Sequence, residues 1–513
     1  MRWRPGIVNL RPRAGVLGTE GSGANTVSEL SLFSVLHAVL AAGLTYDVLL
    51  HKERPVSSVL WLWVVWTLPY AGALAYLTFG KDRVTRGAEQ RAAVRTLVAR
   101  RVELHSTFER HAVDRLHFDP EASHDHPGGH IFRGTDPAVG RNRVLRGNRV
   151  RLLVDGDEFF PELLEAVEKA EDSVHLQTFI FGTGRMPERV RDALAEKASE
   201  GLDVRLLYDR FGSTRAHFTD FFRPARRAGV RVKSISQANP LKGRFQVNLR
   251  NHRKIAVVDG RLGFAGGINV QDKHHGPYAE GNPIRDYHLR LEGPAVSDLQ
   301  LQFVEDWVFA TGTSPDRLLE ARYFPDVDER GDALVQVVPG GPDVEGRGLS
   351  DALFGAITAA ERSLDLVTPY FVPDEPVYQA VRYAALRGVD VRLVVPERGN
   401  HWYAEQAARA LYESLLEAGV RIFERAPPFM HAKALVADGA YAMLGSANLD
   451  YRSLHLNFET NVEVGDPEFA AAVEDQIEEE LRASREVELE EHRSRPVARK
   501  LVQNFCRLFQ PVL

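Results

Sequence analysis

The sequence predicts an α/β protein in which two pseudo-symmetric lobes share one site and follow an N-terminal transmembrane helical hairpin. Three observations support this prediction. Two long uncharged segments stand near the N-terminus, an alternation of amphipathic helix and apolar strand occurs twice after residue 145, and a short His/Lys/Asp pattern occurs once in each repeat. A chain of 513 residues is also too long for one ordinary domain.

Composition narrows the class of protein. The chain is 44 % apolar and 26 % charged, which is typical of a globular protein. Its net charge is −6 and its pI is about 6.3, so we expect no nucleic-acid partner. Cys506 is the only cysteine, which excludes both an intramolecular disulfide and a cysteine-based metal site.

The N-terminal part predicts a membrane anchor. Residues 1–29 are rich in Gly and Arg, and we expect them to be flexible. Residues 30–46 and 56–79 then contain no Asp, Glu, Lys or Arg, and 24 residues of helix span a hydrocarbon core of roughly 30 Å. We therefore predict a transmembrane hairpin over 30–83. A signal peptide explains only the first segment, and a buried core helix is the other alternative.

Basic residues predict the orientation of this hairpin. The linker between the two apolar segments contains only two basic residues of the Lys and Arg type, Lys52 and Arg54. The outer ends hold more basic residues: Arg2, Arg4, Arg11 and Arg13 before the hairpin, and Lys81, Arg83, Arg86 and Arg91 after it. Basic loops remain on the cytoplasmic side, so we expect a multi-pass protein of the cell membrane with cytoplasmic lobes.

Residues 84–144 predict a charged helix followed by a linker. The linker is rich in Pro and Gly and contains four histidines: His117, His124, His126 and His130. Their spacing matches no zinc-site template, and such loops hold ligands poorly. A solvated linker is therefore favoured over a metal site.

The remaining chain contains a loose internal repeat. "LLEAVEKAEDSVHLQTFIF" at 163–181 corresponds to "LFGAITAAERSLDLVTPYF" at 353–371, and "GLDVRLLYD" at 201–209 corresponds to "GVDVRLVVP" at 388–396. The two longer stretches each join an amphipathic helix to an apolar strand. The two shorter stretches each add a further apolar strand. We therefore predict two α/β lobes, residues 145–320 and 321–490, related by a pseudo-twofold axis.

Each predicted lobe contains one copy of a His-x-Lys pattern that ends in Asp-Gly. The first copy is His252, Lys254 and Asp259, and the second is His431, Lys433 and Asp438. Alternate residues of a strand share a face, so each histidine should stand beside its lysine at a strand end. The Asp-Gly pairs are turn signals that close these strands. If the lobes face each other, both pairs reach one pocket.

Two histidines and two lysines in one pocket suit chemistry on a phosphodiester. The lysines neutralise phosphate oxygens and the charge that develops in the transition state. One neutral histidine attacks phosphorus to form a phosphohistidine, and the other donates a proton to the leaving alcohol. This chemistry requires no metal and no cofactor. The alternative is a core histidine beside a lysine at each strand end, which the repetition of the pattern disfavours.

The pattern H-x-K-x-x-x-x-D resembles the signature of the phospholipase D superfamily. That signature continues with small residues and an asparagine, present here as "GGIN" ending at Asn269 and "GSAN" ending at Asn448. The resemblance implies a fold of two phospholipase D-like α/β lobes around one active site. It also implies that Asn269 and Asn448 contact the phosphate.

The resemblance further implies an acidic residue that orients the histidine of the opposite lobe. Asp286 in "RDYHLRLEGPAV" and Glu459 in "LNFETNVEV" occupy the corresponding places. Asp286 is then expected to hold His431, and Glu459 is expected to hold His252. The motif aspartates belong to the catalytic signature, but as turn formers they look more structural than chemical.

Several longer stretches resemble bacterial cardiolipin synthases, among them "LPYAGALAYLTFG", "LVTPYFVPDE" and "SANLDYRSLHLNFE". This resemblance implies transfer of a phosphatidyl group between two phosphatidylglycerol molecules, with His252 as nucleophile, His431 as acid, and glycerol released. A phospholipase D that uses water, a nuclease and a non-catalytic membrane scaffold are the alternatives. The hairpin and the negative net charge argue against a nuclease, and the intact motifs argue against a scaffold.

Residues 491–513 predict an amphipathic C-terminal tail. One helical face collects Leu501, Val502, Phe505, Leu508 and Phe509, with Arg499, Lys500 and Arg507 nearby. Such a helix either lies on a membrane that contains anionic lipid or packs on its own domain, and the sequence leaves both open.

Overall fold

The computed structural model describes residues 23–52, 55–80, 91–94, 96, 98, 128–132, 143–235, 238–239, 244–245, 250–281, 283–342 and 348–510. The chain forms two compact units, Met1–Arg83 and Val84–Leu513. Most of the predicted helix and linker at 84–144 lies outside the described residues, including His117, His124 and His126. Residues 23–29, predicted to be flexible, belong instead to helix α1 (Gly23–His51).

The first unit contains two apolar segments that pack on each other. Within the described residues, Leu32–His51 of α1 is the one helix long and apolar enough to cross a membrane. The second segment is not one continuous helix, contrary to the prediction. It divides into α2 (Pro55–Thr67), α3 (Ala71–Ala75) and the π-helix η1 (Tyr76–Gly80). Pro69 lacks an N–H for helical bonding and Tyr70 adopts a positive φ of 58°, so the helix is interrupted there.

Among the described residues of the second unit, fifteen strands form one sheet whose order mirrors the sequence repeat. From the central seam outward, the first lobe contributes β1 (Leu145–Val154), β10 (Tyr287–Glu292), β8 (Leu262–Gly266), β7 (Ile255–Val258), β2 (Ser173–Thr178), β3 (Asp203–Asp209) and β4 (Arg231–Ile235). The second lobe contributes β11 (Ala333–Gly340), β20 (Glu459–Gly465), β18 (Tyr441–Gly445), β17 (Ala434–Ala437), β12 (Ser363–Val367), β14 (Asp390–Pro396), β15 (Arg421–Arg425) and β21 (Ser484–Glu486). Antiparallel pairing of β1 with β11 joins the lobes.

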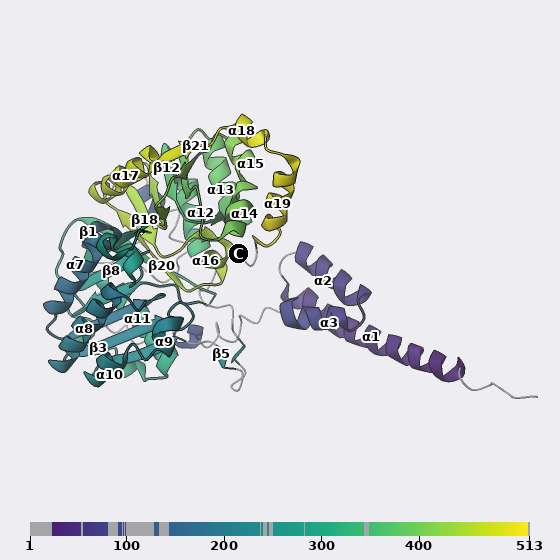
Figure 1. Ribbon diagram of the computed structural model, residues 1–513, viewed down its shortest axis with the longest axis horizontal. Coiled ribbons are helices and arrows are strands. Elements are labelled where there is room, and N and C mark those ends of the chain that lie inside the picture. The colour runs from purple at the N-terminus through teal and green to yellow at the C-terminus, as the bar shows by residue number, and fades with distance from the viewer. Residues whose placement is uncertain are drawn as a thin grey trace, which may run out of the picture. The chain divides into compact units, whose positions relative to one another are not determined.

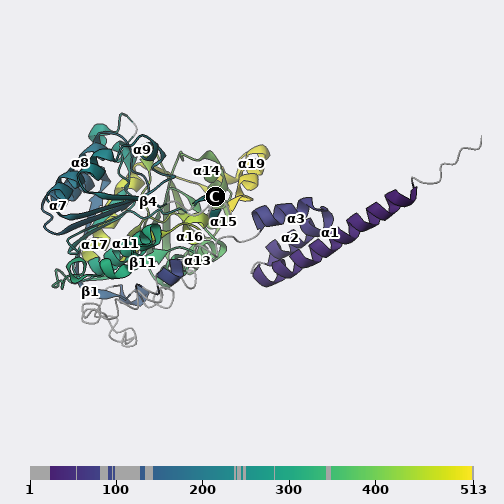
Figure 2. The same cartoon turned by 90° about the horizontal axis from the view of Figure 1, so that it is seen from below.

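Helices cover both faces of this sheet (Figures 1 and 2). The first lobe has α7 (Asp155–Glu168), α8 (Arg185–Ser199), α9 (Thr214–Phe218), α10 (Arg223–Arg227) and α11 (Val296–Thr311). The second has α12 (Leu349–Ala359), α13 (Glu375–Leu386), α14 (Trp402–Arg409), α15 (Tyr412–Glu417), α16 (Tyr451–His455), α17 (Pro467–Arg482), α18 (Leu489–Arg493) and α19 (Val497–Arg507).

Strand β7 shows why both faces are apolar. Its even-numbered residues, Ala256 and Val258, pack with α7 and α8, whereas Ile255 and Val257 pack with α11 on the opposite face. Successive side chains of a strand point to opposite faces, so a strand covered on both sides is apolar throughout. The same alternation occurs in β17. The apolar runs that predicted these strands therefore reflect a sheet buried between two helical layers.

Short pairings outside the large sheet connect the loops that follow its strands. Within the second lobe, β13 (Phe371–Val372) pairs with β19 (Leu449–Asp450), and within the first, β5 (Ala238–Asn239) pairs with β6 (Arg244–Phe245). Two further pairings cross between lobes. Strand β9 (Ile284–Arg285) pairs in parallel with β16 (Phe429–Met430), and Asn251 bridges to Phe458. These crossings lie directly before the motif histidines.

Candidate active site

Both His-x-Lys pairs stand immediately before a sheet strand rather than inside one. Strand β7 begins at Ile255, after Lys254, and β17 begins at Ala434, after Lys433. The prediction that each pair belongs to the strand was therefore wrong. The backbone leaves the sheet here because it pairs with the other lobe: the N–H of His252 donates to Phe458 O at 2.8 Å, and that of His431 donates to Arg285 O at 2.7 Å.

This pairing also delivers a carboxylate from the opposite lobe to each histidine. Glu459 directly follows Phe458, and its Oε2 lies 2.9 Å from His252 Nδ1. Asp286 directly follows Arg285, and its Oδ2 lies 2.6 Å from His431 Nδ1. In both cases the carboxylate belongs to the residue that directly follows the backbone acceptor. The crossed partners implied by the resemblance are therefore the partners that the structure brings together.

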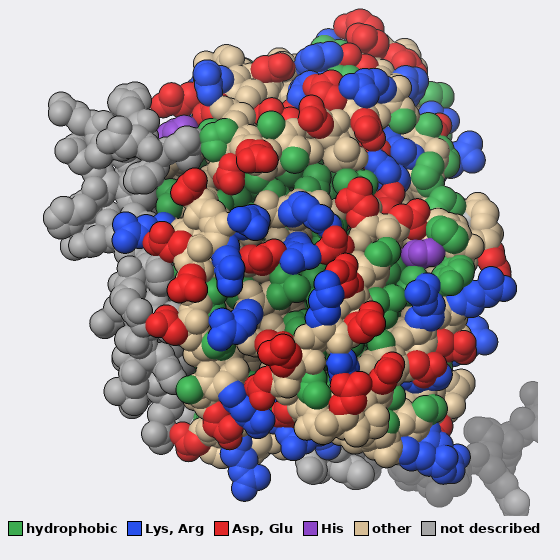
Figure 3. All heavy atoms as spheres, turned by 90° about the vertical axis from the view of Figure 1, so that its left-hand side faces the viewer, with side chains coloured by type: hydrophobic (Ala, Val, Ile, Leu, Met, Phe, Trp, Pro, Cys, Tyr) green, Lys and Arg blue, Asp and Glu red, His purple; other side chains and the backbone are tan. Residues whose placement is uncertain are grey.

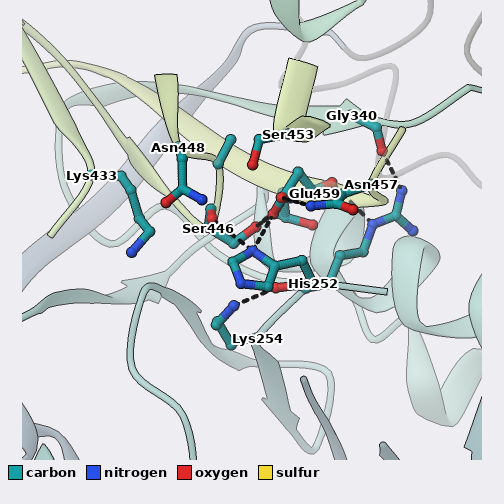
Figure 4. A network of polar contacts seen from close by, with 12 residues as sticks. His252, Lys254, Gly340, Lys433, Ser446, Asn448, Ser453, Asn457 and Glu459 are labelled. Carbon is teal, nitrogen blue, oxygen red and sulfur yellow. Dashed lines mark hydrogen bonds and ion pairs between the residues drawn. The ribbon is translucent and has the colours of Figure 1, made fainter. Parts of the chain in front are cut away.

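His252 has a second acceptor at the same ring nitrogen (Figure 4). Its Nδ1 lies 3.0 Å from Ser446 O, and the hydroxyl of Ser446 donates to Glu459 Oε2 at 2.6 Å. Burial by itself would raise the pKa of Glu459, but His252, Lys254 and Ser446 together lower it, so Glu459 is ionised. Nδ1 thus faces a carboxylate and a carbonyl, neither of which has a proton to donate. The proton must lie on Nδ1, which leaves a lone pair on Nε2.

His431 has a different environment at Nδ1. Besides Asp286, the ammonium nitrogen of Lys433 lies 2.8 Å from that atom. Burial, Lys433 and Lys254 lower the pKa of His431 well below its usual value. The contact with Asp286 is one that suits the protonated ring, because a carboxylate at hydrogen-bond distance favours an imidazolium. An added negative charge near the two lysines would raise the pKa of this histidine.

The two lysines are buried and belong to one electrostatic site. Lys254 Nζ donates to His252 O at 2.6 Å, and Lys433 Nζ donates to His431 O. Burial lowers the pKa of Lys254 to about 7 and that of Lys433 to about 8. Lys433 contributes to the lowering at Lys254 although the two residues come from different lobes. Figure 4 shows Lys254 next to His252 and Lys433 farther off on the side of Asn448, and an anion bound between the two lysines would stabilise both ammonium groups.

The motif aspartates do not join this site. Asp259 and Asp438 lie after the far ends of β7 and β17, with φ of 52° and 56°. Asp259 accepts backbone N–H bonds from residues 171–173, including Ser173 at 2.8 Å, and Asp438 accepts them from residues 361–363. Both therefore form turns and fix the start of a neighbouring strand, as their Asp-Gly pairs predicted. His130 of the predicted linker also contacts Asp438, at 3.1 Å.

The two asparagines predicted to contact phosphate are both buried, and Figure 4 shows Asn448 in the same network as His252. Asn269 Oδ1 accepts from the N–H of Ile180 at 3.0 Å, and Asn448 Nδ2 donates to Asp450 Oδ2 at 3.1 Å. Within the described part of the chain, the NH₂ group of Asn269 donates no hydrogen bond. Gly267 permits the close packing here, because a Cβ at this position would lie 2.0 Å from Asp286 Oδ1.

Sequence reasoning did not identify three residues that complete the site. Ser446 holds Glu459, and fully buried Arg253 donates to Glu459 O at 3.0 Å and to Asp306 Oδ1 at 2.9 Å. His274 is buried 3.8 Å from Asp286 Oδ2, and burial lowers its pKa to about 3. Ser446 and Arg253 stand inside the recognised motifs, so their position in the sequence could have identified them as site residues. His274 follows no pattern, and only tertiary packing reveals it.

Two protein-family models match this chain, and one of them matches both lobes that form the site. The family model described as the phospholipase D-like domain of cardiolipin synthase matches residues 163–307 and 353–481, one block in each lobe. A second model, described as the N-terminal region of the phospholipase D-nuclease family, matches residues 39–81. The chain belongs to the cardiolipin synthase family.

Relatives in the cardiolipin synthase family resemble this chain over nearly its whole length. The cardiolipin synthase of Geobacillus thermodenitrificans is 34 % identical over 491 residues, which cover 94 % of each chain. The major cardiolipin synthase of Bacillus subtilis is 33 % identical over 489 residues, covering 94 % of this chain and 98 % of that protein. The phosphatidylserine synthase of Haemophilus influenzae shares the fold, with a TM-score of 0.56 at 15 % identity, covering 75 % of this chain and all of that one.

Proposed function

We propose that this protein synthesises cardiolipin by transferring a phosphatidyl group from one phosphatidylglycerol molecule to another. The crossed pairing of two histidines with two carboxylates, beside two buried lysines, is the observation that supports this proposal. The full-length relatives named as cardiolipin synthases supply the substrate class.

In the proposed first step, His252 Nε2 attacks the phosphorus of phosphatidylglycerol. The bond from phosphorus to the glycerol oxygen breaks, and His431 donates a proton to that oxygen. A phosphatidyl-histidine and free glycerol result. His252 suits the attack because its Nδ1 proton is held by Glu459 and Ser446, which keeps Nε2 unprotonated. Asp286 favours the imidazolium of His431, which suits a proton donor.

In the proposed second step, the terminal hydroxyl of another phosphatidylglycerol attacks the same phosphorus. His431, now neutral, removes the hydroxyl proton, and the bond between phosphorus and His252 breaks to give cardiolipin. Lys254 and Lys433 stabilise the negative charge on the phosphoryl oxygens in both steps. Burial makes this stabilisation larger than it would be in water.

Membrane anchoring belongs to the same proposal, because both substrates are lipids. Helix α1 has the length and composition of a spanning segment, and Pro69 interrupts the second apolar segment. Interrupted helices occur in membranes where neighbouring helices pack against them, and α2 and α3 pack on α1. We infer that residues 30–83 form a hairpin of two passes and that the lobes face the cytoplasm, as the basic flanks favour.

Product analysis tests the proposal. Purified full-length protein is incubated with phosphatidylglycerol, and lipids and free glycerol are quantified. Cardiolipin and glycerol in equal amounts are expected. Phosphatidic acid with glycerol would identify a phospholipase D, and no turnover would favour a membrane scaffold. A His252→Gln variant, purified in the same way, serves as the inactive control.

A further inference from the structure

The C-terminal helix α19 leaves its apolar side uncovered. Val497, Leu501, Phe505 and Leu508 follow one another at helical spacing and are 71 %, 65 %, 60 % and 74 % exposed. Val502 and Phe509 extend this row, and these six residues are called the apolar face of α19. Gln503 and Cys506 are buried on the opposite side, which packs against α14. The helix is therefore already attached to its lobe by one side while the other remains open.

The charges of this segment favour an anionic partner. Residues 497–510 contain three basic residues, Arg499, Lys500 and Arg507, and no acidic residue, although the whole chain has a net charge of −6. An amphipathic helix with an apolar face and basic flanks has the composition of helices that lie in the interface of anionic membranes. A protein partner would not specifically require this combination of charge and exposed aromatic residues.

Helix α19 packs on α14, the helix that follows the edge of the sheet where the active site lies. Val367, the last residue of β12, pairs with Ala434, which directly follows Lys433, and with Val394 near the end of β14. The segment after β14 leads into α14, whose Trp402 and Tyr403 are exposed. Figures 1 and 2 both show α14 beside α19. Helix α14, on which α19 packs, thus exposes two aromatic residues at its start, just after the carboxyl end of β14.

The first lobe repeats this arrangement. Strand β3 is the counterpart of β14, and the segment after it exposes Phe211 and Phe218. Arg250 lies over the Phe211 ring at 3.7 Å, so basic and aromatic groups are again combined. By contrast, Figure 3 shows a face on the other side of this unit where acidic and basic side chains are interspersed and apolar ones form only small patches. Exposed aromatic residues therefore occur in both lobes in the segments that follow β3 and β14, and two others, Phe354 and Tyr383, are exposed on α12 and α13.

We propose that α19, together with the exposed aromatic residues of α14 and of the segment after β3, docks on an anionic lipid bilayer. Docking turns the sheet edge that carries both His-x-Lys pairs toward lipid headgroups and adds a second membrane contact to the N-terminal anchor. The docking does not depend on which lipid of the bilayer is the substrate. Because its test measures position and not turnover, failure here and failure of the proposed function give different results.

Spin labels on the full-length protein test this docking. In a Cys506→Ser background, nitroxides are attached to Leu501→Cys or Phe505→Cys, and to Ser199→Cys on α8 as the matched exposed control. The protein is placed in nanodiscs that contain phosphatidylglycerol, and collision with oxygen is compared with collision with a water-soluble nickel chelate. Labels at 501 and 505 are expected to collide mainly with oxygen, and the label at 199 with nickel.

A charged variant and a neutral bilayer complete the test. Leu501→Glu combined with Phe505→Glu should reduce the docked fraction, read from a label at Leu508→Cys, by at least about tenfold, because two apolar side chains are lost from the interface. Nanodiscs of phosphatidylcholine alone should also reduce it. Labels at 501 and 505 that collide with nickel, or that are shielded from both reagents by a second copy or another part of the chain, would overturn the proposal. Equal docking in neutral bilayers would do the same.

Discussion

The two copies of the His-x-Lys motif share a backbone plan but differ in the chemistry at Nδ1. In both, an N–H bond to the opposite lobe is followed by a contact to the next carboxylate. At His252, however, Nδ1 faces two acceptors, Glu459 and Ser446 O, whereas at His431 it faces a carboxylate and an ammonium group. The symmetric fold therefore gives the two histidines unequal surroundings, and on this difference we propose that His252 attacks and that His431 transfers protons.

Replacing the histidines one at a time should have the largest effect. His252→Gln is expected to abolish both phosphoenzyme formation and synthesis, by at least about a thousandfold, because the nucleophile is lost. His431→Gln should lose synthesis equally but still form a phosphoenzyme from a nitrophenyl phosphatidyl ester, whose leaving group needs no proton. Rapid-quench measurement of nitrophenol and of bound lipid separates the two. Equal loss with the ester in both variants would contradict the unequal roles.

Neutralising Glu459 or Asp286 should slow the reaction less than replacing a histidine does. The two changes should again affect different steps. Glu459→Gln removes the charge that holds the Nδ1 proton of His252, and we expect phosphoenzyme formation to slow about a hundredfold. Asp286→Asn should slow reaction with phosphatidylglycerol to a similar extent but leave reaction with the nitrophenyl ester within a few fold. Single-turnover rates with both substrates provide the check. A large effect of Asp286→Asn on the ester would show that the carboxylates act alike.

Exchanging the small residues beside the carboxylates sharpens the comparison further. Ser446→Gly makes the second lobe resemble the first and removes the hydroxyl bond to Glu459, so phosphoenzyme formation should slow about tenfold. The reverse change, Gly267→Ser, introduces a Cβ 2.0 Å from Asp286 Oδ1 and should displace that carboxylate from His431. Single-turnover rates and thermal melting distinguish the two changes. A Ser446→Gly enzyme with unaltered rates would exclude a role for this hydroxyl.

The lysines should give the smallest effect, visible as an alkaline limb of the pH profile. With pKa values of about 7 and about 8 in the free enzyme, Lys254 and Lys433 lose their charge as the pH rises through this range. The value of kcat/KM should then fall several fold between about pH 7 and pH 9, because the neutral amines no longer stabilise the phosphoryl oxygens. In kcat the limb should move to higher pH, since a bound anion raises both pKa values. A profile of kcat/KM that stays flat above pH 8 would contradict the assignment.

Much of the fold could be predicted because it depends on local periodicity. The repeated helix and strand patterns at 163–181 and 353–371 become α7 with β2 and α12 with β12, at mirrored places in one sheet. The turns at Asp259 and Asp438 follow from their Asp-Gly pairs. The break at Pro69 follows from the proline, which removes a helical hydrogen bond, although the uninterrupted apolar character of 56–79 favours a single helix.

The geometry of the site depends on contacts between the two lobes. Sequence periodicity carries no information about these contacts. The extended backbone at His252 looks like the start of β7, yet its hydrogen bond goes to Phe458, more than two hundred residues away. The crossed carboxylates were anticipated only through resemblance to a known family. His274 lies beside Asp286 through tertiary packing, and no spacing rule connects it to the motif.

Mapping the covalent intermediate tests the central claim most directly. The His431→Gln enzyme is mixed with the nitrophenyl phosphatidyl ester and quenched in alkaline denaturant, which preserves phosphohistidine, and the modified peptide is sequenced by mass spectrometry. The unequal environments of the two histidines predict the phosphatidyl group on Nε2 of His252. In the reciprocal His252→Gln enzyme no adduct should form. An adduct on His431 in that variant would show that the second-lobe histidine is a competent nucleophile and would contradict the account.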